Sequence, residues 1–213
     1  MMKKILLPVM AVVFLGSAVF AEIGVGVKAG YGKDDSNIKS GATGNVKHDD
    51  DFVGAYSGVE ALYEMKGSYF NLPDNHSFGV RVGLDVLAED VVKQKTAGIK
   101  TTSNGMKIPL SLYYRYTPTD SKFSSWIGAG AAWGFMYYEQ KAPGKRDETE
   151  NKIFPFVSTG VEYRFTRFFS LGIDGTYNFS AKIKSDKFNA PNGSTLYRDL
   201  GGLSGAVTAR FYF

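Results

Sequence analysis

Residues 155–179 read PFVSTGVEYRFTRFFSLGIDGTYNF. In each half of this stretch, apolar side chains alternate with polar or small ones, so each half has an oily face and a polar face. Alternation with a period of two is typical of a β-strand, because successive side chains point to opposite faces. Only Thr166 and Arg167 separate the two halves. The stretch therefore predicts two long antiparallel strands joined by a tight turn.

The same alternation recurs along the rest of the chain, between polar segments rich in Gly, Pro and Asp. It predicts eight strands, at residues 22–31, 52–64, 77–88, 105–116, 123–138, 152–165, 168–181 and 199–213. The connections after the first, third, fifth and seventh strands are long and charged, those after the fourth and sixth are short, and the one after the second is intermediate. An even number of antiparallel strands with long loops at one end is the plan of a bacterial outer-membrane barrel.

The first residues predict export. Lys3 and Lys4 precede an apolar run at residues 5–20, and small residues lead up to Ala21, which is typical of a secretory signal peptide. An uncleaved anchor is the alternative, but the run is short for a bilayer span and contains Pro8. We therefore expect a signal peptide at residues 1–21 and one barrel domain at residues 22–213.

Composition narrows the function classes. The formal charge of +4 falls to +2 when the two signal-peptide lysines are removed, which does not favour a nucleic-acid partner. The chain has no cysteine, which excludes disulfides, thiolate metal sites and cysteine nucleophiles. After residue 21 no apolar run is long enough for a membrane-spanning helix. If the chain crosses a membrane, it does so with strands.

The apolar face of all eight predicted strands lacks ionisable residues. In the seventh strand, for example, Phe169, Leu171 and Ile173 alternate with Ser170, Gly172 and Asp174. A Lys or Arg on the lipid face of a barrel costs about 2–4 kcal/mol at the bilayer midplane, so we expect this face to meet lipid. Aromatic residues near the strand ends predict two girdles: Tyr63, Phe78, Tyr116, Phe123, Phe165, Phe169 and Phe213 on the periplasmic side, and Tyr31, Trp133, Phe135, Tyr137, Tyr177 and Phe179 on the outer side.

Ionisable residues fall on the opposite faces of the strands. An eight-stranded barrel has an interior just wide enough for side chains, and charges removed from water there must pair. We therefore predict a network of ion pairs that fills the lumen without a wide channel. Its members are Lys28, Glu60, Arg81, Asp85, Lys107, Arg115, Glu162, Arg164, Asp174 and Arg210, with Glu64 near a strand end.

With these features, the chain resembles the small eight-stranded outer-membrane proteins of the OmpA, OmpX and OmpW type, including opacity-like barrels. The resemblance rests on the signal peptide, the hairpin plan, residues 155–179 and the terminal ARFYF. It implies a monomer in the bacterial outer membrane, with membrane lipids, lipopolysaccharide and the barrel assembly machinery as partners, and leaves open a ligand held by the loops. It also implies an assembly signal in the last strand, formed by Phe213, Phe211, Ala209 and Val207.

We expect no catalytic residue, cofactor or metal. Enzymes that resemble this family use a His near a Ser and a carboxylate, and this chain has only His48 and His76, with His76 and Ser77 on opposite faces. The acidic residues of the first long loop, Asp34, Asp35 and Asp49–Asp51, could collect a hard cation, but solvated loop charges explain them better. The same holds for a phosphate contact by Lys182, Lys184, Lys187 and Arg198.

Three functions follow from these features. The first is a non-enzymatic outer-membrane barrel with a plugged polar lumen, which supports the envelope or presents loops for recognition or adhesion. The second is a passage for small apolar molecules that resembles OmpW. The third is a secreted ligand-binding barrel that resembles a lipocalin, whose apolar face would line an internal cavity.

Overall fold

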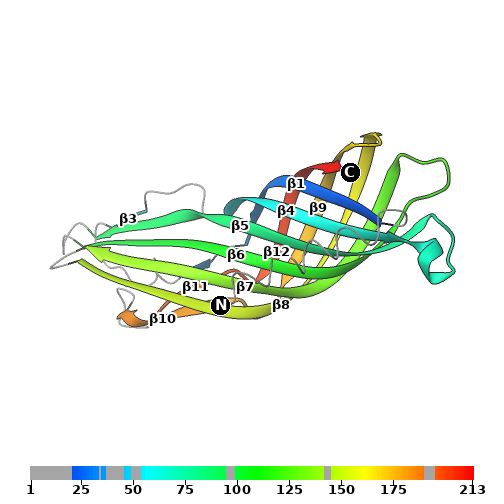
Figure 1. Ribbon diagram of the computed structural model, residues 1–213. Coiled ribbons are helices and arrows are strands. Elements are labelled where there is room, and N and C mark those ends of the chain that lie inside the picture. Colours follow the sequence, from blue (N-terminus) through cyan, green and yellow to red (C-terminus); the bar gives the residue numbers. More distant parts are fainter. Residues whose placement is uncertain are drawn as a thin grey trace, which may run out of the picture.

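The computed structural model describes residues 21–33, 35–36, 46–48, 54–94, 99–141, 145–189 and 195–213. Eight long strands form the barrel: β1 (Ala21–Gly32), β4 (Ala55–Lys66), β5 (His76–Gln94), β6 (Ile99–Tyr116), β7 (Phe123–Lys141), β8 (Lys145–Thr166), β9 (Phe169–Asn178) and β12 (Gly202–Tyr212). Each pairs antiparallel with its neighbour in chain order, and β12 pairs with β1. The sheet is therefore closed (Figure 1), which confirms the predicted fold class. The predicted signal peptide lies outside the described residues except for Ala21, so it stays a prediction.

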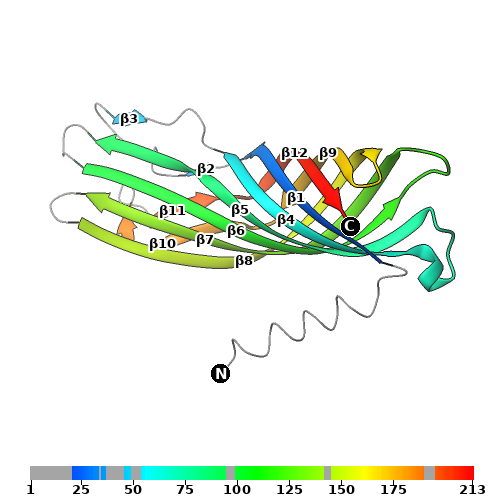
Figure 2. The ribbon, with the colours of Figure 1, turned by 45° about the horizontal axis from the view of Figure 1, so that its top comes forward.

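The two ends of the barrel differ. At one end, here called the turn end, the strands are joined by the 3₁₀ helix η3 (Gly67–Phe70) and by short turns at residues 117–122 and 167–168. At the other, the loop end, β3 (Val46–His48) pairs with the tip of β5. There a second sheet forms from β2 (Asp35–Ser36), β10 (Lys182–Asn189) and β11 (Thr195–Asp199). β5 to β8 project beyond the other strands at this end (Figure 2).

Four strands are longer than the sequence predicted. The segments at residues 89–104 and 140–151 were expected as charged loops, but β5 reaches Gln94, β6 begins at Ile99, β7 reaches Lys141 and β8 begins at Lys145. The expected loop at residues 182–198 instead contains β10 and β11, which pair with each other. Beyond the membrane both faces of a strand can meet water. A run of charged residues there does not prevent a strand from forming.

The barrel wall is apolar outside and polar inside. The outward side chains of its middle section are large and exposed, for example Val27, Val59, Leu112, Ile127 and Ile173. The inward ones include buried charged groups such as Glu60, Arg81, Glu162 and Arg210. This arrangement contradicts the lipocalin-like alternative, which needs the apolar face to line the interior. Among the described residues, no helix combines the length and hydropathy that a membrane span requires.

The two faces exchange character toward the loop end. On β8, the outward residues Val157 and Ile153 are followed by Asn151 and Thr149, while the inward side changes from Ser158 to Phe156 and Phe154. The same happens on β7, where the inward Met136 and Tyr138 are fully buried. A cluster of apolar side chains fills this part of the interior: Leu87, Ala132, Met136, Tyr138, Phe154, Phe156, Ala181, Ile183, Leu196 and Leu200. We call it the apolar cap.

Candidate functional site: the charge network of the lumen

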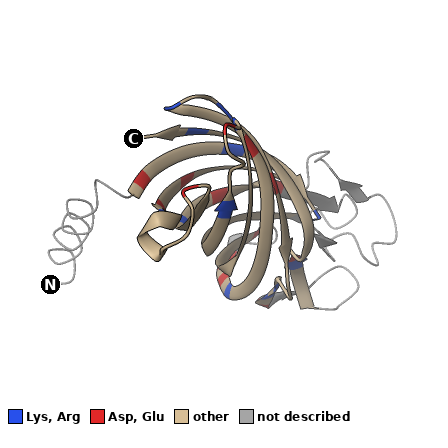
Figure 3. Cartoon of the chain, turned by 90° about the vertical axis from the view of Figure 1, so that its right-hand side faces the viewer, with Lys and Arg blue, Asp and Glu red and all other residues tan. Residues whose placement is uncertain are grey.

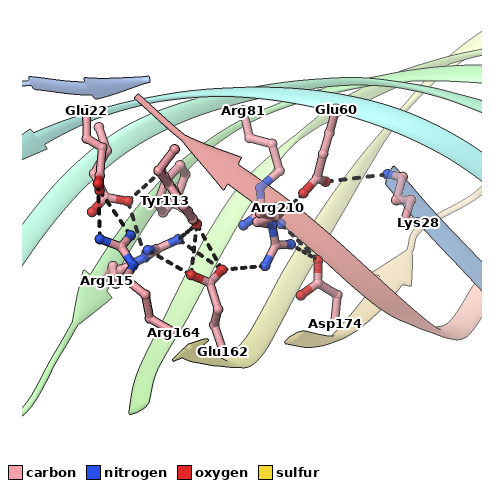
Figure 4. A network of polar contacts seen from close by, with 12 residues as sticks. Glu22, Lys28, Glu60, Arg81, Tyr113, Arg115, Glu162, Arg164, Asp174 and Arg210 are labelled. Carbon is pink, nitrogen blue, oxygen red and sulfur yellow. Dashed lines mark hydrogen bonds and ion pairs between the residues drawn. The ribbon is translucent and has the colours of Figure 1, made fainter. Parts of the chain in front are cut away.

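Arg210 on β12 is the centre of the buried charges. Its guanidinium is 0% exposed and donates to three carboxylates on three different strands. The distances are 2.6 Å from Nε to Glu60 Oε1, 2.7 Å from Nη1 to Glu162 Oε2 and 2.5 Å from Nη2 to Asp174 Oδ2. The planar, five-donor guanidinium suits several acceptors at once better than an ammonium group does. Arg210 therefore links β12 with β4, β8 and β9 across the lumen (Figure 4).

A second arginine continues the network toward the turn end. Arg115 Nη1 lies 3.3 Å from Glu162 Oε1, and its Nε lies 3.2 Å from Glu64 Oε2. Two tyrosines add hydrogen bonds: the Tyr113 hydroxyl donates to Glu64 at 2.8 Å, and the Tyr212 hydroxyl donates to Glu162 at 2.8 Å. Glu162 thus interacts with two arginines and a tyrosine, which is the dense pairing that a buried carboxylate needs.

The network also reaches toward the loop end. Lys28 Nζ lies 2.7 Å from Asp85 Oδ1, and Lys107 Nζ lies 3.5 Å from Asp85 Oδ2. Arg81 Nη1 lies 3.2 Å from Asp174 Oδ2, and its guanidinium lies 3.8 Å from the centre of the Trp126 ring. This face-on position is favourable for a cation, because the aromatic ring carries negative charge density on its face.

A half-exposed pair closes the network at the turn end. The Arg164 guanidinium donates two bonds of 3.0 Å to Glu22, and it lies 4.1 Å from the centre of the Tyr212 ring. Counting this pair, the network holds six cationic and six anionic side chains: Lys28, Arg81, Lys107, Arg115, Arg164 and Arg210 with Glu22, Glu60, Glu64, Asp85, Glu162 and Asp174. Its formal charge is zero, so the paired groups leave no net charge in this part of the lumen.

Two glycines give the long side chains room. A Cβ at Gly160 would lie 2.6 Å from Trp126 Nε1 and 2.7 Å from Asp174 Oδ1, and one at Gly172 would lie 3.0 Å from Arg210 Nη1. Any side chain at these positions would displace the network. The cavity that remains beside Lys28, Arg81 and Asp174 measures about 40 Å³, which is room for only a few water molecules.

Above this cavity the apolar cap closes the barrel. Ile183 of β10 and Leu196 of β11 are buried against the cap residues of β7 and β8. Arg198 of β11 is fully buried and donates to Ser103 O at 3.1 Å and to Ala88 O at 2.9 Å, which ties β11 to β5 and β6. The idea that Arg198 meets external phosphates is therefore wrong, because its side chain points into the protein.

All ten predicted network residues have side chains turned to the interior, and each makes at least one of the contacts above. Eight of them, all but Asp85 and Lys107, are labelled in Figure 4. Figure 3 looks onto the barrel from the turn end and shows both signs of charge on its strands. Sequence reasoning missed Glu22, Tyr113, Tyr212 and Trp126. Glu22 alternates with the outward Ile23, and this spacing could have identified it. Tyr113, Trp126 and Tyr212 offered no such signal, because an uncharged aromatic side chain on the inward face carries no formal charge to pair.

The side chains proposed as an assembly signal lie on the outward face of β12 and, for Phe213, directly after its end. Phe213, Phe211 and Val207 are exposed, and Ala209 is half-buried. β12 pairs with β9 from Gly202 to Phe211, and its pairing with β1 closes the barrel. The last strand would therefore be accessible to the assembly machinery before the barrel closes. Its role as an assembly signal stays a prediction.

Aromatic side chains group at the turn end in two arrays of ring contacts. One includes Phe123, Tyr163, Phe165, Phe169 and Phe211, with centroid separations of 4.7–5.9 Å. The other includes Tyr69, Phe70, Phe78, Tyr114, His76 and Tyr116, with separations of 5.2–5.8 Å. Rings with an apolar body and a polar edge accumulate where lipid meets water, which supports a membrane boundary at this level.

The histidine that the sequence singled out is not arranged as a catalytic base for Ser77. His76 Nδ1 lies 2.6 Å from the Tyr114 hydroxyl, and Ser77 is buried on the opposite face of β5. The side chains of His48 and of the acidic residues at positions 34, 35 and 49–51 lie outside the described part of the chain. Within that part, no group of three His, Cys, Asp or Glu residues could hold a metal ion.

Neither a family model nor a curated protein sequence matches the chain. Among solved structures, it is similar to a major outer-membrane protein of Thermus thermophilus, with a TM-score of 0.50, 15% identity and coverage of 90% of this chain and 99% of that one. It is also similar to OprG of Pseudomonas aeruginosa (TM-score 0.47, 13% identity, coverage 91% and 96%). A third similar structure is Ail of Yersinia pestis in complex with sucrose octasulfate, with a TM-score of 0.46, 11% identity and coverage of 91% of this chain and 97% of that one.

Identities this low show the fold and nothing of the activity. The closed order of eight strands, the exposed apolar belt and the buried charges agree with that fold. The belt is the surface of a protein that lies in a bilayer, because soluble proteins rarely expose an apolar patch of this extent. The chain thus has the fold of the small eight-stranded outer-membrane β-barrels.

Proposed function

We propose that this protein is a non-enzymatic barrel of the bacterial outer membrane that is closed to solutes and holds a structured platform of strands above the membrane. The observation that carries this proposal is the double closure of the interior. The charge network crosses the membrane part of the lumen, with a cavity of about 270 Å³ at its turn end beside Glu22, Glu64 and Arg115, and the apolar cap fills the part beyond the network. A closed barrel can act by supporting the envelope or by presenting the loop end to a partner.

The extent of the loop end supports a role in recognition or adhesion. The eight residues from Lys145 to Lys152 of β8 lie beyond the outer boundary that the exchange of faces defines, and span about 26 Å along the strand at ~3.3 Å per residue. The extension has a packed interior of its own, in which Tyr138 donates to Ile183 O at 3.0 Å. A fixed surface binds with a smaller loss of conformational entropy than a flexible loop does. Assembly in the outer membrane would use the outward residues of β12.

Conductance in planar lipid bilayers tests the closure. We expect no stable openings from the purified protein, because the charge network and the apolar cap leave only a small cavity of about 40 Å³ between them. Stable openings of the unmodified protein would contradict the proposal and favour a passage that resembles OmpW. Arg210→Ala is the matched variant for the charge network. It loosens the network but leaves the apolar cap in place, so it should also show no stable openings, and cation-selective openings of this variant would show that the cap does not close the barrel.

A further inference from the structure

The β4–β5 connection exposes three large apolar side chains at the turn end. Tyr69 and Phe70 of η3 are 64% and 43% exposed, and Leu72 just after it is 41% exposed. The connection between β6 and β7 has the sequence TPTDSK and carries no large apolar residue. Exposed residues of turns are usually polar or small. We call Tyr69–Leu72 the aromatic loop; it overlaps the short teal coil between β4 and β5 at the right of Figure 1.

The aromatic loop is held in one shape by its own backbone. Asn71 takes the left-handed conformation with φ 59° and ψ 28°, and its N–H donates to Ser68 O at 3.3 Å. Leu72 N–H donates to Gly67 O at 3.0 Å, and His76 N–H donates to Pro73 O at 3.1 Å. These N–H groups therefore have partners inside the loop. This lowers the cost of moving the loop out of water, where unpaired backbone groups are expensive.

The exposed rings continue the lipid-facing surface of the barrel. Phe78 lies on the outward face of β5, two residues before the exposed Val80. Phe70 meets Phe78 edge to face with ring centres 5.2 Å apart, and Tyr69 meets Phe70 in the same way at 5.3 Å. Phe78 in turn contacts Tyr114 at 5.3 Å. The array thus runs without a break from the belt onto the loop.

We propose that the aromatic loop is an interfacial anchor whose Tyr69, Phe70 and Leu72 enter the headgroup region of the phospholipid surface at the turn end. Its partner is the lipid itself, because the loop is continuous with the belt, and aromatic rings of this kind favour the boundary between lipid and water. The exposed Lys66 and Asp74 flank it and stay in water. The proposal rests on the placement of the barrel in a bilayer, and the test below separates the two.

The absence of cysteine allows single nitroxide probes without background labelling. The protein is reconstituted in vesicles of phosphatidylcholine and phosphatidylglycerol, with a probe on Leu72→Cys. Collisions with oxygen and with a water-soluble nickel chelate then measure its depth. Interfacial segments lie ~5–10 Å into the boundary between headgroups and acyl chains, and we expect the Leu72 probe there. Thr119→Cys, in the polar turn at the same end, is the matched control and should report water.

A probe on Val82→Cys, in the apolar belt, tests the barrel itself and should report the acyl chains. An aqueous reading at Leu72 with a lipid reading at Val82 would overturn the anchor but leave the barrel in the membrane. Aqueous readings at both positions would overturn the membrane placement. Phe70→Ser should shift the Leu72 probe toward water, because it removes the ring that links the loop to Phe78. If the loop instead binds a periplasmic protein, the Leu72 probe reports water in pure lipid, and the proposal is wrong.

Discussion

The membrane part of the lumen and the apolar cap are enclosed by the same strands, yet their interiors are opposite in character. Toward the turn end the interior holds charges, and toward the loop end it holds Phe154, Met136 and Ile183. The difference comes from what lies outside the wall. In the membrane the outward face of each strand must be apolar because it meets lipid, so the alternating polar residues point into the lumen. Beyond the membrane the outer face meets water, and the apolar residues can turn inward.

This comparison predicts the largest loss of stability at the hub of the membrane part. Arg210→Met leaves Glu60, Glu162 and Asp174 without their shared partner, and breaking one side of a buried ion pair costs about 3–5 kcal/mol. The free energy of unfolding in urea, followed by the gel shift between folded and heated protein, measures this. Arg167→Met, at the exposed turn between β8 and β9, should cost less than ~1 kcal/mol. A loss below ~1 kcal/mol for Arg210→Met would show that water solvates the carboxylates.

Removing a side chain from the apolar cap should have a large but local effect. Ile183→Ala deletes buried methyl groups between β10 and the wall, and such changes cost about 2–5 kcal/mol. Hydrogen exchange should therefore speed up in β10 and β11, while the urea transition of the barrel stays unchanged. Lys184→Ala changes the exposed neighbouring position. It should change the free energy of opening, as measured by hydrogen exchange, by no more than ~0.5 kcal/mol. If the barrel transition also fell, the two regions would be one cooperative unit.

A pair of lysine substitutions on the outward face of β8 tests the boundary between the regions. Val161→Lys places a charge in the belt and should cost about 2–4 kcal/mol. Thr149→Lys places the same charge on the same face beyond the boundary and should cost no more than ~0.5 kcal/mol. Folding titrations in lipid vesicles compare the two. Equal costs would show that the bilayer boundary does not lie between these residues.

Sequence alone predicted the barrel because the bilayer imposes a rule that can be read without coordinates. Every second residue of a strand such as β9 must be apolar, and Phe169, Leu171 and Ile173 obey it. Inward side chains were predictable for the same reason. Their pairing was not, because Arg81 and Glu162 find their partners across the lumen rather than along the strand. The neighbours Asp85 and Arg164 instead bind Lys28 and Glu22.

The loop end could not be predicted in the same way. Its strands contain runs such as KRDETENK at residues 145–152, whose outward face meets water and so carries no apolar alternation. β10 offers only Ile183 as a large buried side chain among its described positions, which is too little to indicate a strand. What fixes this hairpin is the packing against β7 and β8 and the hydrogen bonds of Arg198. Both depend on residues far away in the sequence.

The exchange of faces along β8 also sets the height of the protein relative to the lipids. Moving the barrel outward would lift the exposed Ile153 into water, and moving it inward would drag Asn151 and Thr149 among acyl chains. Both displacements are unfavourable, so the protein has one resting depth. In a thinner or thicker membrane the closed, hydrogen-bonded wall yields less readily than the lipids, so the surrounding bilayer adjusts its thickness to the protein.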